Sequence, residues 1–156
     1  MTVHDMHLEE SVDIAASPQT VFALVSDLPR MGEWSPENQG GRWEDGSSGA
    51  TGDIFHGTNK IGEREWTVAC EITVADPGST FEWITGASED EGPYVRWRYD
   101  FVDNGTGGTT MTEIWDVELL PPTLRALSDE QLAGRKKQVH GAMQATVAGI
   151  KATAEA

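Results

Sequence analysis

Hydrophobic and polar residues alternate along much of the chain between residues 39 and 120, a pattern typical of β-strands with two different faces. The clearest case is residues 94–120, where two alternating runs flank the glycine-rich stretch 104–108, which predicts a β-hairpin. If the hairpin is symmetric, Tyr99 lies opposite Glu113 and Trp97 opposite Trp115. Alternate side chains share a face, so Glu113 is expected on a largely apolar face with Met111, Trp115, Val117 and Leu119.

Other alternating segments predict about six strands in this region, or seven with residues 10–17 near the start. Short runs around Trp43, around Phe55 and Asn59, and around Phe81 and Trp83 are separated by Gly, Asp and Pro turn residues. The longest run, residues 64–78, is expected to place one set of side chains on a single face: Trp66, Val68, Cys70, Ile72 and Val74.

Three segments have helical signals. Ser17 is a good N-cap, Pro18 suits a first helical position, and Pro29 ends this helix. A second short helix or turn is expected before Pro36. The end of the chain predicts a long helix, because Ser128 and Gln131 form a capping-box pattern before an apolar stripe at helical spacing: Leu132, Val139, Met143, Thr146 or Val147, and Ile150.

The order of these elements predicts one α+β domain covering residues 1–156. Its strands would form a strongly curved antiparallel sheet wrapped around the long C-terminal helix, with two short helices after the first strand. A curved sheet and a helix across it leave space between them. Large side chains fill that space, or a cavity remains.

Composition narrows the possible functions. The chain has 156 residues, of which 38% are hydrophobic, and a formal net charge of −15. Such a surface disfavours nucleic acids and anionic membranes, which bind through Lys and Arg. No apolar run approaches a membrane helix, and the first residues lack a secretory signal pattern, so we expect a cytoplasmic protein without membrane insertion.

No metal site or cofactor is expected. The single cysteine, Cys70, excludes an intramolecular disulfide and a cysteine cluster, and no two histidines have the spacing of zinc ligands. Six tryptophans are many for this length and need either a core to fill or a cavity to line. Arg96 and Arg98 alternate with Trp97 and are expected to face solvent.

The order of elements and several segments resemble the START-related helix-grip proteins, the SRPBCC or polyketide cyclase/dehydrase and lipid-transport superfamily, in the style of actinobacterial members. The similar segments are "SVDIAASPQTVFALVSDLPRMGEWSPE", "GGRWEDGSSGATGDIFHGTN", "VRWRYDFVDNGTGGTTMTEIWDV" and the amphipathic final helix. The resemblance implies a long pocket between the sheet and the helix, with a small hydrophobic ligand as partner. We expect a monomer or a homodimer. Members differ widely in function, so the fold alone leaves the function open.

Three functions therefore stay open. The first is binding of a lipid-like or polycyclic ligand, with Glu113, Tyr99 and Asn59 as polar contacts. The second is a cyclase, aromatase or dehydratase in which Glu113 and Tyr99 are catalytic and move protons. The third is a protein–protein module of the co-chaperone or toxin-like kind, which would need a collapsed core and an exposed apolar patch.

The candidate ligand-binding residues are mainly aromatic and come from different elements: Trp34, Trp43, Phe55, Asn59, Trp66, Trp83, Trp97, Tyr99, Glu113, Trp115, Val139 and Met143. The competing interpretations are structural. The aromatic residues fill a core, Asn59 belongs to a turn, and Glu113 is paired with an Arg or Tyr or lies at a strand end open to water.

Overall fold

A computed structural model describes residues 2–156, with His4 described by its backbone only. It contains a seven-stranded sheet in the order β1-β7-β6-β5-β4-β3-β2, in which each neighbouring pair is antiparallel. The strands are β1 (His7–Ile14), β2 (Asn38–Trp43), β3 (Ile54–Ile61), β4 (Arg64–Asp76), β5 (Thr80–Thr85), β6 (Val95–Asp103) and β7 (Thr109–Val117).

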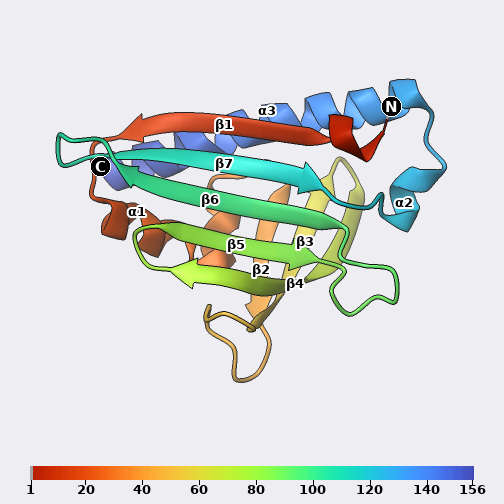
Figure 1. Cartoon of the computed structure of the whole chain (residues 1–156), viewed down its shortest axis with the longest axis horizontal. Helices are drawn as coiled ribbons and strands as arrows, with labels where there is room; N and C mark the ends of the chain where they lie inside the picture. The colour runs from red at the N-terminus through yellow and green to blue at the C-terminus, as the bar shows by residue number, and fades with distance from the viewer. Residues whose placement is uncertain (1) are drawn as a thin grey trace.

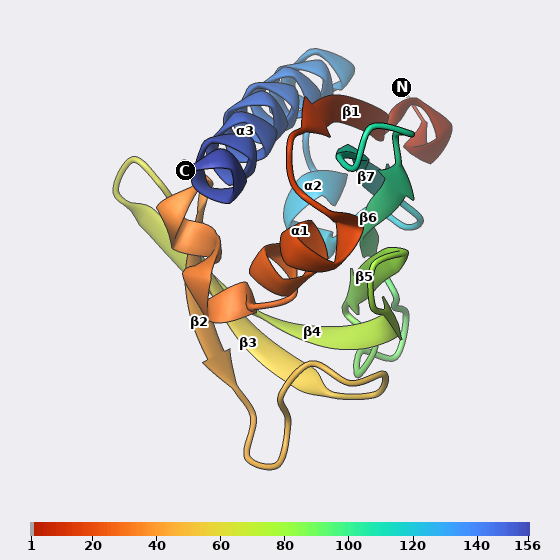
Figure 2. The ribbon, with the colours of Figure 1, turned by 90° about the vertical axis from the view of Figure 1, so that its left-hand side faces the viewer.

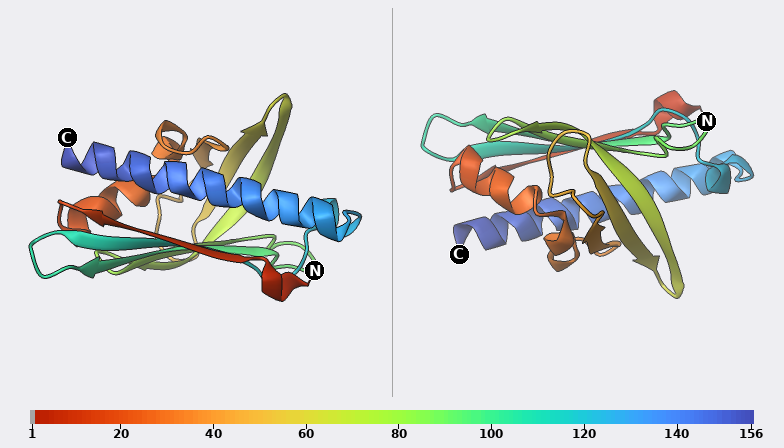
Figure 3. Two further views of the ribbon diagram at one scale, coloured as in Figure 1. Left: turned by 90° about the horizontal axis from the view of Figure 1, so that it is seen from above. Right: turned by 90° about the horizontal axis from the view of Figure 1, so that it is seen from below.

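Five helical segments accompany this sheet within residues 2–156, and all but the first lie on its concave side. They are η1 (Val3–Asp5), α1 (Pro18–Val25), η2 (Leu28–Glu33), α2 (Pro122–Arg125) and α3 (Asp129–Glu155). Figure 1 shows β1, β7, β6 and β5 side by side with α3 behind them, and Figure 2 shows the sheet curving around α1 and α3. In Figure 3, α3 runs across the sheet while the β3–β4 hairpin projects to one side. The structure is the predicted helix-grip α+β fold.

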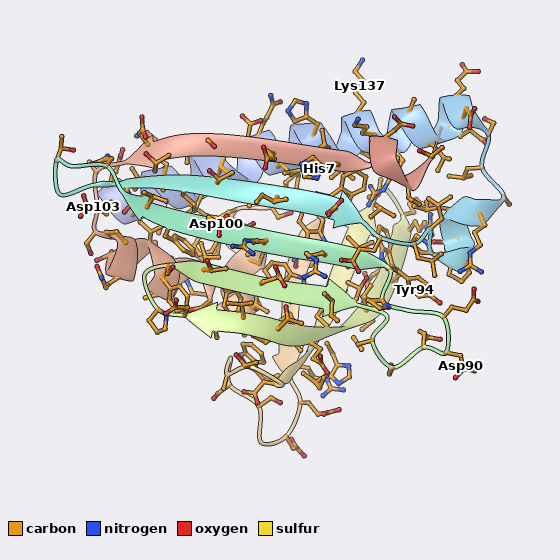
Figure 4. All side chains as sticks on the ribbon, in the orientation of Figure 1. His7, Asp90, Tyr94, Asp100, Asp103 and Lys137 are labelled. Atoms are coloured by element: carbon orange, nitrogen blue, oxygen red, sulfur yellow. The ribbon has the colours of Figure 1, made fainter. Side chains whose placement is uncertain are left out.

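The long helix α3 begins at the predicted cap. The Ser128 side chain accepts a hydrogen bond from the Gln131 backbone N–H, and the Gln131 side chain accepts one from the Ser128 N–H. The predicted stripe is buried against the sheet side: Leu132, Val139, Met143, Thr146, Val147 and Ile150. Lys137, in contrast, projects away from the sheet (Figure 4). No helix within residues 2–156 is long and apolar enough to span a membrane.

The hairpin of β6 and β7 has the predicted register, with Tyr99 opposite Glu113 and Trp97 opposite Trp115. The prediction for β4 was wrong at one residue. Ile72 pairs with Trp83 but Val74 pairs with Glu82, so a β-bulge at this point turns Val74 to the face opposite Ile72.

The convex face of the sheet holds an ion-pair network, which corrects the expectation that Arg96 and Arg98 are simply solvated. Both side chains are partly buried and contact Glu82, which is only 3% exposed, with an Arg96 Nη1 to Glu82 Oε1 distance of 2.6 Å. Arg98 also donates to Asp100, at 2.9 Å, on the face turned toward the viewer in Figure 4. The pairs with Glu82 link β5 to β6 on the convex face of the sheet.

Candidate functional site

A cavity of about 720 Å³ lies between the concave face of the sheet and α3. Strands β3 to β7 supply one wall, and the side of α3 that carries Val139 and Met143 supplies the other. The segments around η2 and α2 close its ends with residues such as Met31 and Leu124. The curvature seen in Figure 2 thus encloses a volume that the side chains do not fill.

Aromatic rings form much of the cavity wall. The Trp83 ring stacks on Trp97, with centroids 6.4 Å apart and planes at 21°, and on Tyr99, at 5.9 Å and 26°. These rings line up because β5 and β6 pair Trp83 with Trp97 and project both to the concave face. The result is an aromatic wall inside the cavity, which suits an apolar molecule.

Glu113 lies on β7 in this wall and is 3% exposed. Its cross-strand neighbours are Tyr99 on β6 and Glu10 on β1. Its Oε2 atom is buried and has no hydrogen-bond partner. An unpaired buried polar atom is costly, so this oxygen is a candidate contact point for a ligand.

Burial raises the pKa of Glu113 from 4.5 to about 8. The hydrogen bond with Tyr99 acts in the opposite direction and lowers this pKa, while the Glu10 carboxylate raises it. Burial, and secondarily Glu113, raises the pKa of the Tyr99 hydroxyl well above its usual value. Near neutral pH the carboxyl group is therefore mainly protonated, but a small rise in pH ionises it.

Glu10 connects this buried group with the surface. Its Oε2 lies 3.0 Å from Nε2 of His140 on α3, and the two side chains are 25% and 41% exposed. Glu10 and Glu113 are directly opposite on antiparallel strands, where side chains are close neighbours. The carboxylate of Glu10 thus adds negative potential beside Glu113.

A second charged contact crosses the cavity edge. Arg135 on α3 makes two hydrogen bonds to Glu37, from Nη1 at 2.9 Å and from Nη2 at 2.5 Å. Both residues line the cavity, and Glu37 lies in the segment between η2 and β2. This bidentate pair joins the helix to the far side of the sheet.

The cavity brings together most of the residues that the sequence analysis singled out: Phe55, Asn59, Trp66, Trp83, Trp97, Tyr99, Glu113, Trp115, Val139 and Met143. Trp34 and Trp43 do not line it. Trp34 packs under α3 against Gly149 and donates from Nε1 to the Thr153 hydroxyl at 2.8 Å, while Trp43 packs edge-on against Phe55.

Sequence reasoning missed several cavity residues, among them Tyr94, Glu37 and Arg135. Tyr94 lies just before β6, near the end of the sheet (Figure 4), and strand alternation predicted it on the face of Arg96 and Arg98 rather than on that of Trp97. Arg135 belongs to the short basic run Arg135-Lys136-Lys137, which by itself does not indicate a cavity residue. A signal was available, since Arg135 precedes Val139 by one helical turn and so lies near the apolar stripe.

Within residues 2–156 no group of three or more His, Cys, Asp or Glu residues is arranged to hold a metal ion. Cys70 is buried in the cavity wall, where burial raises the pKa of its thiol to about 12. Such a thiol stays protonated and is a poor nucleophile. The polar chemistry of the cavity therefore centres on Glu113.

Comparisons with known proteins agree with this geometry. The family described as "Polyketide cyclase / dehydrase and lipid transport" matches residues 5–155. The Polyketide_cyc-like protein Cgl2372 from Corynebacterium glutamicum is 30% identical, with a TM-score of 0.65, over 94% of this chain and 89% of its own. No match was found among curated proteins.

Two more distant structures share the fold alone. A START superfamily protein from Mycobacterium smegmatis is 17% identical, with a TM-score of 0.67, and covers 96% of this chain and 97% of that one. The di-domain ARO/CYC StfQ from the steffimycin biosynthetic pathway is 11% identical, with a TM-score of 0.75. There the match covers 96% of this chain and 50% of that one.

Proposed function

Because this chain belongs to the polyketide cyclase, dehydrase and lipid transport family, we propose that it binds a small hydrophobic molecule in the cavity between the sheet and α3. The observation that carries the proposal is the cavity itself, about 720 Å³ in volume and walled by stacked aromatic rings. Ligand pockets in proteins typically measure about 300–1,000 Å³ and combine apolar walls with a few polar groups. Here those groups are Glu113, Tyr99 and Asn59.

Binding can be tested with pyrenebutanol, a neutral fluorescent probe with a flat apolar body. We expect it to bind the wild-type protein and to receive excitation energy from the cavity tryptophans. Ala142 lines the cavity on α3, so Ala142→Phe should fill part of the space and weaken binding by about tenfold, or about 1.4 kcal/mol.

Ala145 supplies the matched control, because it lies on the same helix but is exposed and outside the cavity. Ala145→Phe should leave the affinity unchanged. Equal effects of the two substitutions, or no binding by the wild-type protein, would contradict the proposal. Native mass spectrometry of the purified protein, followed by extraction, would reveal any molecule that it already carries.

A second candidate function is supported by the titration of Glu113. A carboxyl group with a pKa of about 8 beside a tyrosine hydroxyl can both give and take a proton near neutral pH. Glu113 and Tyr99 would then act as the proton-transfer pair of a cyclase, aromatase or dehydratase, and the cavity would hold a polyketide-like chain in a folded shape. Undiminished turnover of such a chain by Glu113→Gln would exclude this role.

A protein–protein module is the least supported of the three functions. It required a collapsed core and an exposed apolar patch. The cavity is open, and within residues 2–156 Val102 is the one large hydrophobic residue that is exposed. A single exposed valine makes no patch.

A further inference from the structure

We propose that the ligand carries a positively charged amine, and that its ammonium group binds the Glu113 carboxylate among the aromatic rings of the cavity. This inference rests on the proposed binding function and names the chemical class of the ligand. Three features of the described structure support it: an unpaired carboxylate oxygen, a negative surrounding potential, and aromatic faces beside it.

The first feature is the missing cation. Glu113 Oε2 has no hydrogen-bond partner, and within residues 2–156 no lysine, arginine or histidine forms an ion pair with this residue. Buried carboxylates in proteins are ordinarily paired or neutral. When Glu113 ionises, the site offers half of an ion pair, and a ligand cation would supply the other half.

The second feature is the set of charges that face Glu113. Glu113 lies opposite Glu10 on β1 and opposite Tyr99, with its hydroxyl, on β6. The ring of His140 on α3 contacts Glu10 rather than Glu113. Farther along the cavity the Arg135 charge is balanced by Glu37. Arg64 also lines the cavity, and its Cζ lies over the Trp66 ring, 5.0 Å from the ring centroid.

These groups leave the potential at Glu113 negative. The net charge of −15 strengthens it over the whole molecule and draws cations toward the surface. An anionic ligand would have to approach against this potential. Of the two guanidinium groups that line the cavity, Arg135 already holds Glu37, and Arg64 lies at the start of β4, in the β3–β4 hairpin.

The third feature is the aromatic surroundings. Tyr99 lies directly opposite Glu113, Trp115 follows it on the same face of β7, and Trp97 lies opposite Trp115. The faces of such rings attract cations, and the attraction grows when water is excluded. A ligand with an apolar body and an ammonium head would thus satisfy both the wall and the carboxylate.

This pairing couples binding to a proton. The free protein holds Glu113 mainly protonated at pH 7, because the pKa is about 8. An ammonium group binds the ionised form, so each molecule bound at pH 7 releases close to one proton from Glu113 to the solvent. A neutral ligand that accepts a hydrogen bond from protonated Glu113 releases none.

Three probes with the same body separate the possibilities: pyrenebutylamine, pyrenebutanol and pyrenebutyrate. Their affinities would be measured by fluorescence titration between pH 7 and pH 9, where an alkylamine with a pKa of about 10.4 stays charged. We expect the amine to bind most tightly and the butyrate least. Amine affinity should rise about tenfold from pH 7 to pH 9 as Glu113, with a pKa of about 8, ionises.

Two variants and one further measurement identify the group responsible. Glu113→Gln keeps the size of the side chain and should remove both the preference for the amine over the alcohol and the pH dependence. His140→Gln removes the neighbouring titratable ring and should keep both. Calorimetry of the wild-type protein in buffers of different ionisation enthalpy should detect proton release with the amine only, and it needs no variant.

Several outcomes would overturn the inference. Binding of the alcohol as tightly as the amine, with no proton release, would overturn it while leaving the proposed function intact. Tighter binding of the butyrate would favour an anionic ligand at Arg135. An amine preference that survives in Glu113→Gln would reflect the overall negative charge instead. Failure of all three probes to bind would contradict the proposed function as well.

Discussion

At the scale of single residues, Glu113 is the most unusual feature of the molecule. Its carboxyl group is buried with one oxygen unpaired, and burial raises its pKa to about 8. The unfolded chain would ionise the same group near pH 4.5. Between these two values the folded protein binds a proton that the unfolded chain does not, so the free energy of unfolding falls as the pH rises.

We therefore predict that Glu113→Gln is more stable than the wild-type protein above about pH 5. The difference should grow with pH, reach on the order of 3 kcal/mol at pH 7, and level off above the pKa of about 8. Urea unfolding of both proteins at intervals from pH 4 to pH 9 would measure it. A difference that stays constant across this range would contradict the assigned titration.

At the scale of elements, the glycines of α3 separate into two kinds. Gly134 and Gly141 have open space where a Cβ atom would lie, whereas a Cβ on Gly149 would meet Trp34 Cβ at 3.0 Å. Helix propensity alone predicts that each of the three weakens the helix. The structure shows that only position 149 requires a residue without a Cβ atom, because the helix approaches Trp34 closely there.

Alanine substitutions should show this difference. Gly134→Ala and Gly141→Ala should each raise the free energy of unfolding by up to about 1 kcal/mol, the difference in helix propensity. Gly149→Ala should lower it, since the new methyl group displaces Trp34 and with it the hydrogen bond to Thr153. Equilibrium unfolding of the three variants would compare them, and a gain in stability for Gly149→Ala would refute the close approach.

The elements also show what the sequence could and could not predict. The register of β6 and β7 follows from a symmetric turn and strict alternation, which placed Tyr99 opposite Glu113. The bulge before Val74 has no such signal, because its cause is the pairing of β4 with β5. The pair of Arg135 with Glu37 joins residues 98 positions apart, beyond the reach of any local pattern.

At the scale of the whole molecule, the inward-facing aromatic residues divide into those that fill the core and those that line the cavity. The parity of the strands predicted which side chains point inward, but it could not say how far the helix stands from the sheet. That distance decides whether a tryptophan fills the core, as Trp34 does, or lines a cavity, as Trp97 does. The volume of about 720 Å³ is thus a property of the assembled fold.

The ion pair between Arg135 and Glu37 has a kinetic consequence. It joins α3 to the segment before β2 across the cavity edge, whereas β5 and β6 are held together from behind by Glu82 and its arginines. The wall with the stacked rings is thus cross-linked within the sheet, whereas this pair is one of the contacts that hold α3 at the other edge of the cavity. The two side chains are 22% and 16% exposed, so added salt weakens their contact only in part. A bound molecule should accordingly dissociate faster as ionic strength rises, even where its own contacts are wholly apolar. Its residence time would then depend on an ion pair that need not touch the ligand.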